Sequence, residues 1–211
     1  MLVGHAAILP WPESAPVTPM NLAEGGRLFS CDADEREESD MTGSEPVTEL
    51  DARYSSDGAV ATTWDEARGR LESAPVSWLS TVRPDGQPHV TPLISVWVDD
   101  ALYFTTGPDE RKAENLARNP HCVLTTGCNA LDEGLDIVVE GDAVRVEDDA
   151  KLQRIADAYE SKYGSDWHFD VRDGAFHHEA GSAVVFEVAP VTAFGFRKGE
   201  PFSQTRWRFS R

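Results

Sequence analysis

The stretch WLSTVRPDGQPHVTPLISVWVDDALYFTTG, residues 78–107, decides the fold of this chain. It is dense in Val, Thr, Trp and Phe, and its apolar residues alternate with polar ones, as in strands with one buried face. Two short interruptions, Pro84-Asp85-Gly86-Gln87 and Asp99-Asp100, have the composition of tight turns. The stretch therefore predicts three antiparallel strands that follow one another in a meander.

The residues that follow predict further strands. HCVLTTG (121–127), AVVFEVAPVTAFGF (183–196) and TRWRF (205–209) have the same apolar and β-branched character. DIVVEGDAVRVED (136–148) is interrupted at Gly141-Asp142 and predicts either one bent strand or a hairpin. Strands of this kind, linked mostly by tight turns, predict a six- or seven-stranded antiparallel β-barrel with flanking helices.

Two helices are predicted beside these strands. TWDEARGRLESA (63–74) begins with Thr63 and has Glu66 three residues later, which is the spacing of a capping box. DDAKLQRIADAYESKYG (148–164) carries four apolar residues at helical spacing, with an Asp as its N-cap and Gly164 as its stop. We expect the apolar face of this second helix to pack on the sheet.

Residues 1–58 are expected to form an acidic, largely disordered extension, followed by one domain over residues 59–211. The first 60 residues contain twelve acidic and three basic side chains, and CDADEREESD (31–40) has no apolar period. Such a segment cannot bury enough apolar surface to offset the entropy lost on ordering. Met41 is a second start position, and a protein that begins there would lack residues 1–40.

The composition excludes several classes of protein. A formal net charge of −18 disfavours binding to nucleic acids and to anionic membranes. Three cysteines without a CxxC pair indicate neither a disulfide framework nor a zinc site. The apolar runs are shorter than the roughly 18 residues of a membrane span, and no basic region precedes the apolar N-terminal stretch. We therefore expect a cytoplasmic protein.

The basic pair Arg111-Lys112 stands out in this acidic chain. It lies in YFTTGPDERKAENLARNP (103–120), near the start of a predicted helix over residues 109–118 with Asp109 as the N-cap. Cations beside the free amides of a helix start predict a bound anion, and a phosphate fits best. In the alternative interpretation both cations are solvated and paired with neighbouring acidic residues.

From about residue 64 to residue 209 the sequence resembles the pyridoxamine 5'-phosphate oxidase-like family of split-barrel flavin and deazaflavin proteins. The matching segments are WLSTVRPDGQPHVTPLISVW (78–97), ALYFTTGPDERKAENLARNPHCVLTTG (101–127) and IVVEGDAVRV (137–146). The resemblance implies a split β-barrel that binds FMN or coenzyme F420. It also implies a homodimer, because the sites of this family form between two subunits.

The resemblance also implies site residues. Arg111 and Lys112 would hold the cofactor phosphate with the hydroxyls of Thr105 and Thr106. The strand after the first turn would lie along the cofactor ring, with His89, Thr91, Pro92 and Leu93 facing it largely through backbone groups.

The implied activity is hydride transfer between F420, or else FMN, and a small conjugated organic substrate. F420 is favoured because the strand HVTPLISVW lacks a cation, whereas Arg118, Arg206 and Arg208 could meet the acidic tail of F420. The alternatives are a non-catalytic FMN- or heme-binding protein, a pyridoxamine 5'-phosphate oxidase and an interaction module without a cofactor.

Other roles are left open by the sequence. No residue is identified as catalytic: His89, His121, Tyr103 or water could donate a proton. His177 and His178 are adjacent and would point to opposite faces of a strand, so no metal site is predicted.

Overall fold

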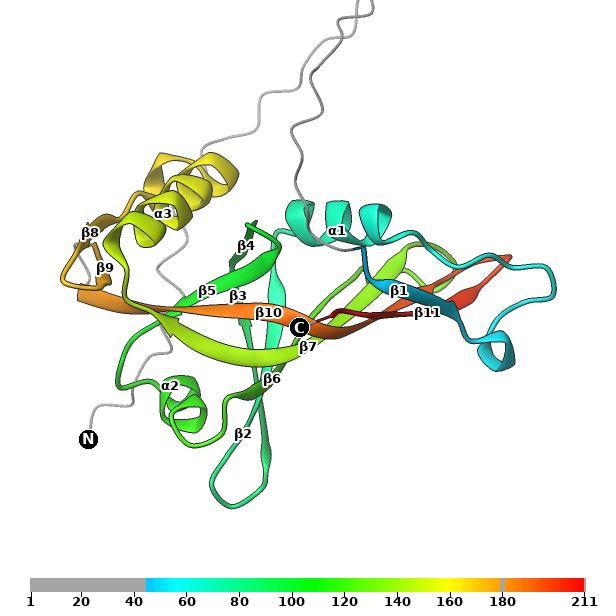
Figure 1. The fold of residues 1–211 in the computed structure, drawn as a ribbon, viewed down its shortest axis with the longest axis horizontal. Coiled ribbons are helices and arrows are strands. Elements are labelled where there is room, and N and C mark those ends of the chain that lie inside the picture. The colour runs from blue at the N-terminus through cyan, green and yellow to red at the C-terminus, as the bar shows by residue number, and fades with distance from the viewer. Residues whose placement is uncertain (1–44, 179–180, 211) are drawn as a thin grey trace, which may run out of the picture. The chain divides into compact units, whose positions relative to one another are not determined.

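A long pair of antiparallel strands, β7 (Leu135–Val146) and β10 (Gly181–Arg197), crosses the whole domain (Figure 1). The computed structural model describes residues 45–178 and 181–210, and expectations for residues 1–44 lie outside this part of the chain. β7 is one bent strand, the first of its two predicted forms. A Cβ on Gly141 would lie 2.6 Å from the Ala189 carbonyl oxygen, so glycine permits the close approach of the two strands.

The other edge of β10 changes partner along its length. Residues Val184–Val188 pair with β5 (Ala101–Thr106), whereas residues Thr192–Arg197 pair with β11 (Ser203–Arg208). Pro190, which has no N–H to donate, lies between the two segments, and the register with β7 shifts at the same point. The sheet therefore divides here.

The predicted meander contains four strands: β2 (Ser77–Val82), β3 (Pro88–Leu93), β4 (Ser95–Val98) and β5. Its second predicted strand is interrupted at Ile94, so that β3 pairs with β2 and β4 pairs with β5. Tyr163 holds this break, because its hydroxyl accepts from the Ser95 N–H at 3.2 Å and donates to the Ser95 carbonyl at 2.9 Å. Asp99 and Asp100 have φ values of +46° and +60°, as expected for the turn into β5.

The sheet runs in the order β1-β11-β10-β7-β6-β2-β3, with β1 at Val47–Leu50 and β6 at His121–Thr126, and does not close into a continuous barrel. The predicted class, a mostly β split barrel with flanking helices, is confirmed. Residues 45–178 and 181–210 form eleven strands, more than the six or seven predicted, because short strands were missed. Two of these form a small hairpin, β8 (Asp170–Arg172) and β9 (Ala175–His178).

Two apolar clusters hold the domain together. Inside the barrel, Leu102 and Phe104 of β5 pack in the cluster that contains Trp207, which we call the barrel cluster. On the opposite face of β5, Tyr103 packs beneath α3 (Asp149–Tyr163), whose Tyr159 is fully buried. We call this second group the α3 cluster. Because successive side chains of β5 point to opposite faces of the strand, β5 contributes apolar side chains to both clusters.

The two long predicted helices form with caps that the sequence indicated. In α1 (Trp64–Ser73), the Thr63 hydroxyl accepts a hydrogen bond from the Glu66 N–H at 3.3 Å. Asp148 caps α3 by accepting from the Lys151 N–H at 2.7 Å, and a short 3-10 helix (Ser165–Trp167) follows. Within residues 45–178 and 181–210, no helix has both the length and the apolarity that crossing a bilayer requires.

The end of the predicted extension belongs to the sheet. β1 (Val47–Leu50) pairs with β11 in antiparallel register, and a 3-10 helix (Ala52–Tyr54) follows it. Glu49 forms ion pairs with both Arg206 and Arg208. The prediction of disorder was therefore wrong for this segment, because a four-residue strand without a fully buried side chain can be stabilised by pairing with a distant strand.

This pairing can be tested by truncation. We expect a chain that begins at residue 45 to unfold at the same temperature as the full chain. A chain that begins at residue 59 loses the β1–β11 ladder and the hydrogen bond from the Asp51 N–H to the Gln204 carbonyl. At about 1 kcal/mol per net hydrogen bond, we expect a loss of about 3 kcal/mol and a melting temperature lower by roughly 6–12 °C. Equal melting temperatures for the two truncated chains would contradict a structural role for β1.

Candidate functional site

Helix α2 (Arg111–Leu116) carries the basic pair and is shorter than predicted. The predicted range was 109–118 with Asp109 as the N-cap, but the N-cap is Glu110, whose side chain makes no capping hydrogen bond. A helix of six residues has a small macrodipole. An anion bound here would therefore depend on side-chain charge more than on the helix.

Both cations of the pair have carboxylate partners. The Arg111 guanidinium lies 3.5 Å from the Glu114 carboxylate, and the side chain is 60% exposed. Lys112 forms an ion pair with Glu110 and is only 12% exposed. These pairs agree with the alternative interpretation of the two cations, although the two environments differ strongly in their access to solvent.

Strand β3 points alternate side chains toward and away from the barrel. His89, Thr91 and Leu93 face inward, where Leu93 packs against the barrel cluster, while Pro92 and Val90 face outward. Four residues of this strand were expected to face the cofactor ring. Three of them point into the barrel, whereas Pro92 points outward. Within the described residues, His89 Nδ1 and Thr91 Oγ1 are buried polar atoms with no hydrogen-bond partner. A buried polar atom without a hydrogen-bond partner destabilises the fold, unless a ligand or a water molecule supplies the missing hydrogen bond.

Three cations act on His89. Burial lowers the pKa of His89, and the positive charges of Arg83, Lys112 and Arg111 lower it further. We call Arg83, Arg111 and Lys112 the basic cluster. Because it brings three positive charges around one imidazole in a chain of net charge −18, it is a local exception to the charge of the protein.

Helix α2 is fixed to the β2–β3 hairpin by a buried contact. The Asn115 side-chain amide donates to the Thr81 hydroxyl at 2.9 Å, and Thr81 is the register partner of His89. In Figure 1, α2 and the free end of this hairpin lie on the same side of the domain. This contact explains how residues more than twenty positions apart in sequence form one cluster.

The two predicted threonines of β5 are separated by the pleat. Thr106 is buried on the barrel side, whereas Thr105 has its side chain on the opposite face. The Thr106 hydroxyl lies beside both the Gly107 carbonyl, at 3.2 Å, and the Glu110 carboxylate. Of the predicted hydroxyl ligands, only Thr106 therefore lies at the basic cluster.

The expected proton donors do not all lie at the site. Tyr103 is buried beneath α3, on the face of β5 away from the barrel interior. His121 lies on the outer surface of β6, where its Nδ1 is 2.5 Å from Asp142 Oδ1. Only His89 lies with the basic cluster.

Some residues of the site were not found by sequence reasoning. Arg83 and Asn115 were not assigned a role, and Glu110 was named only as one possible ion-pair partner of the two cations, with Asp109 and Glu114. Arg83 could have been found, because it directly precedes the predicted hairpin turn and its N–H donates to the Gln87 carbonyl across it. The role of Asn115 depends on the packing of α2 and left no local signal.

Two of the three remaining expected cations, Arg206 and Arg208, form ion pairs within the sheet. Arg206 and Arg208 lie on one face of β11 and Trp207 on the other, as predicted, but Glu49 binds both arginines. Arg118 is exposed just beyond α2. A cavity of about 250 Å³ beside β11 is lined by Glu49, Leu50, Asp51, Arg53, Phe194, Gln204 and Arg206, none of which belongs to the basic cluster.

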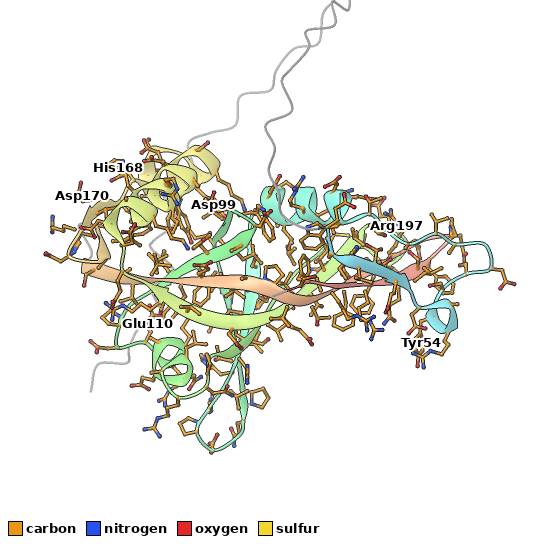
Figure 2. All side chains as sticks on the ribbon, in the orientation of Figure 1. Tyr54, Asp99, Glu110, His168, Asp170 and Arg197 are labelled. Atoms are coloured by element: carbon orange, nitrogen blue, oxygen red, sulfur yellow. The ribbon has the colours of Figure 1, made fainter. Side chains whose placement is uncertain are left out.

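Histidines elsewhere make other contacts. His168 Nδ1 lies 2.6 Å from Glu160 and its Nε2 lies 3.9 Å from Asp170, a group that joins α3 to β8 (Figure 2). Its pKa is raised by the hydrogen bond and the charge of Glu160. Within residues 45–178 and 181–210, no three His, Cys, Asp or Glu side chains are grouped to hold a metal ion.

Several solved structures share this fold at low sequence identity. A conserved hypothetical protein of Mycobacterium tuberculosis is 20% identical (TM-score 0.54), with 66% of this chain and 88% of that chain covered. A Bacteroides thetaiotaomicron protein, named for 5-nitroimidazole antibiotic resistance, is 17% identical (TM-score 0.55; 78% and 92% covered). A heme binding protein of Mycobacterium smegmatis is 16% identical (TM-score 0.55; 69% and 59% covered).

The sequence itself matches one family. None of the proteins with curated descriptions matches the chain. The family model described as pyridoxamine 5'-phosphate oxidase matches residues 63–196. This range includes α1, the β2–β3 hairpin, α2 and nearly all of β10, and so contains the whole basic cluster. The chain therefore belongs to the pyridoxamine 5'-phosphate oxidase family.

Proposed function

We propose that the protein is an oxidoreductase that binds F420 or FMN and transfers hydride between this cofactor and a small conjugated organic substrate. The observation that carries the proposal is the basic cluster around His89. Positive side chains that are held together in a strongly acidic chain are suited to an anionic ligand. A phosphate-bearing cofactor supplies such an anion.

The unpaired polar atoms of the site fit the same ligand. His89 Nδ1, Thr91 Oγ1 and Arg83 Nε are buried and, within the described residues, have no hydrogen-bond partner. A ligand with phosphate oxygens and polar ring atoms could complete such groups. Membership of the family supports a cofactor of this kind at the same place.

In this proposal the polypeptide binds and orients, and the cofactor supplies the hydride chemistry when bound. Arg111 and Lys112 would hold the phosphate with the Thr106 hydroxyl, and the backbone of β3 would lie along the ring. Since the pKa of His89 is lowered, its imidazole is neutral near pH 7 and can either donate or accept a hydrogen bond.

We further propose that the site is completed by a second copy of the chain. The outward face of β2 and β3 is apolar, with Trp78 51% exposed and Val90 52% exposed. Trp78 is the register partner of Pro92, so this surface continues across both strands. An apolar strip of this kind is usually covered by a partner.

A cofactor carrier without turnover is the second candidate. The fold is shared with a protein named as heme binding, which is the observation that favours it. A pyridoxamine 5'-phosphate oxidase is a further alternative, which the name of the family supports.

Titration with cofactors separates these functions. We expect F420 to bind more tightly than FMN, because Arg118 is exposed beyond α2 and could meet the acidic tail of F420. Its affinity should fall with added salt, since exposed charge pairs are screened. Absorption spectra report binding, and reoxidation of reduced F420 with biliverdin or quinones as acceptors reports turnover. Tighter binding of FMN without F420 oxidation would favour the second candidate.

Charge reversal tests the basic cluster. Arg111→Glu removes a two-pronged phosphate contact and adds repulsion, so we expect cofactor affinity to fall by roughly 10- to 100-fold. Arg145→Glu is the matched control, because Arg145 is also an exposed arginine in a short-range pair, with Glu147 at 3.3 Å. Isothermal titration measures both. Equal affinities of the two variants would remove the phosphate assignment.

Light scattering measures the oligomeric state and so tests whether a second copy of the chain completes the site. We expect a homodimer at micromolar concentration, and Trp78→Glu should shift it to monomer because a charge would be buried in the apolar strip. Val60→Glu serves as the control, since Val60 is 78% exposed and lies outside the sheet. A monomeric unmodified protein would contradict the shared site.

A further inference from the structure

The carboxylate of Glu110 lies among the groups that would bind a phosphate. Its Oε1 accepts a hydrogen bond from the Gly107 N–H at 2.8 Å, and its Oε2 forms an ion pair with Lys112. The Thr106 hydroxyl is beside it as well. Figure 2 shows Glu110 on the segment that joins β5 to α2. A negative charge of the protein itself thus lies at the expected anion position.

This pair differs from the other ion pair on the same helix. The side chains of Lys112 and Glu110 are 12% and 28% exposed, whereas those of Arg111 and Glu114 are 60% and 56% exposed. Burial alone would raise the pKa of Glu110, but hydrogen bonds from Lys112, the Gly107 N–H and Thr106 hold that pKa below its ordinary value. Glu110 is therefore ionised near neutral pH.

Packing keeps Glu110 in place. Its Oε1 lies 3.1 Å from the position that a Cβ on Gly107 would occupy, so the side chain folds back over this glycine. Two separate donors, an amide and an ammonium, hold its two oxygens. A phosphate would therefore bind beside Glu110 and use the remaining N–H groups of Lys112.

We propose that Glu110 is a specificity-determining residue, which weakens the binding of a phosphate with two negative charges more than the binding of a phosphate with one. This inference rests on the proposed function and names the cofactor class more narrowly. A phosphodiester, as in F420, carries one charge, whereas a phosphomonoester, as in FMN, carries nearly two at pH 7.

Electrostatics gives the direction of this preference. Lys112 and Glu110 together have no net charge, so Lys112 adds hydrogen bonds but little attraction. Repulsion by the Glu110 carboxylate grows with the charge of the bound phosphate, and the low exposure of the pair limits its screening. The cost is therefore about twice as large for the dianion as for the monoanion.

The test measures FMN and F420 affinities of the unmodified protein, Glu110→Gln and Glu114→Gln. Gln at position 110 keeps an oxygen that can accept from the Gly107 N–H, removes the negative charge and replaces the oxygen that accepts from Lys112 with an amide NH2. We expect Glu110→Gln to bind FMN about tenfold more tightly and F420 about threefold more tightly. Glu114→Gln, on the exposed pair, should leave the ratio of the two affinities unchanged.

The same substitution in a Lys112→Met variant tests whether the charge of Glu110 causes the change in FMN affinity. In Lys112→Met, Glu110 loses its partner, so the added Glu110→Gln should increase FMN affinity more than it does beside Lys112. The chemical shift of the Gly107 amide, followed by NMR, reports whether its hydrogen bond persists in each variant. A Glu110→Gln variant that does not fold would be replaced by Glu110→Ser, with the same expected change in the affinity ratio.

The outcomes separate the two proposals. An unchanged ratio of FMN to F420 affinity in Glu110→Gln overturns the specificity role while the proposed function stands. If no variant binds either cofactor, the proposed function fails and the inference fails with it. A larger gain for FMN than for F420, absent in Glu114→Gln, supports the inference.

Discussion

The pairing of β7 with β10 is the constraint on which the rest of this structure depends. These two strands pair along nearly their whole length, whereas the other edge of β10 serves β5 first and β11 afterwards. The change of partner at Pro190 divides the sheet, and the barrel cluster and the α3 cluster form on the two faces of β5. Pro190, which has no N–H, lies between the residues of β10 that pair with β5 and those that pair with β11.

The position of α2 follows from this arrangement. β5 ends at Thr106 after pairing with β10, and the chain then turns through Gly107 into α2, which is fixed to Thr81 by Asn115. The same contact places the end of the β2–β3 hairpin, and with it His89 and Arg83, beside the basic pair. The rigid sheet therefore assembles the site and its β2–β3 hairpin supplies Arg83, while the short helix supplies Arg111 and Lys112.

The positive charges of the site are partly compensated by neighbouring carboxylates, unlike those of a purely cationic pocket. Lys112 is compensated by Glu110, and Arg111 is partly compensated by the exposed Glu114. The pKa of His89 is lowered by burial and by the surrounding cations. The net attraction for an anion is thus moderate, and the buried polar atoms without partners add a requirement for hydrogen bonding. The outward apolar strip of β2 and β3 lies on the other face of the same hairpin.

The sequence by itself determined the mostly β fold class, both long helices and the turn at Asp99-Asp100, and it left open whether the segment at Gly141 is a bent strand or a hairpin. These features depend on local periodicity, capping and turn chemistry, which are written in neighbouring residues. Only the tertiary structure decided the break at Ile94, the β1–β11 pair and the partners of Lys112. The opposite orientations of Thr105 and Thr106, and of Thr91 and Pro92, follow from the local pleat of their strands, whereas the packing of α3 on β5 removed Tyr103 from the site. Pairing between distant strands and the packing of α2 decide the remaining points, because both depend on contacts between residues far apart in the chain.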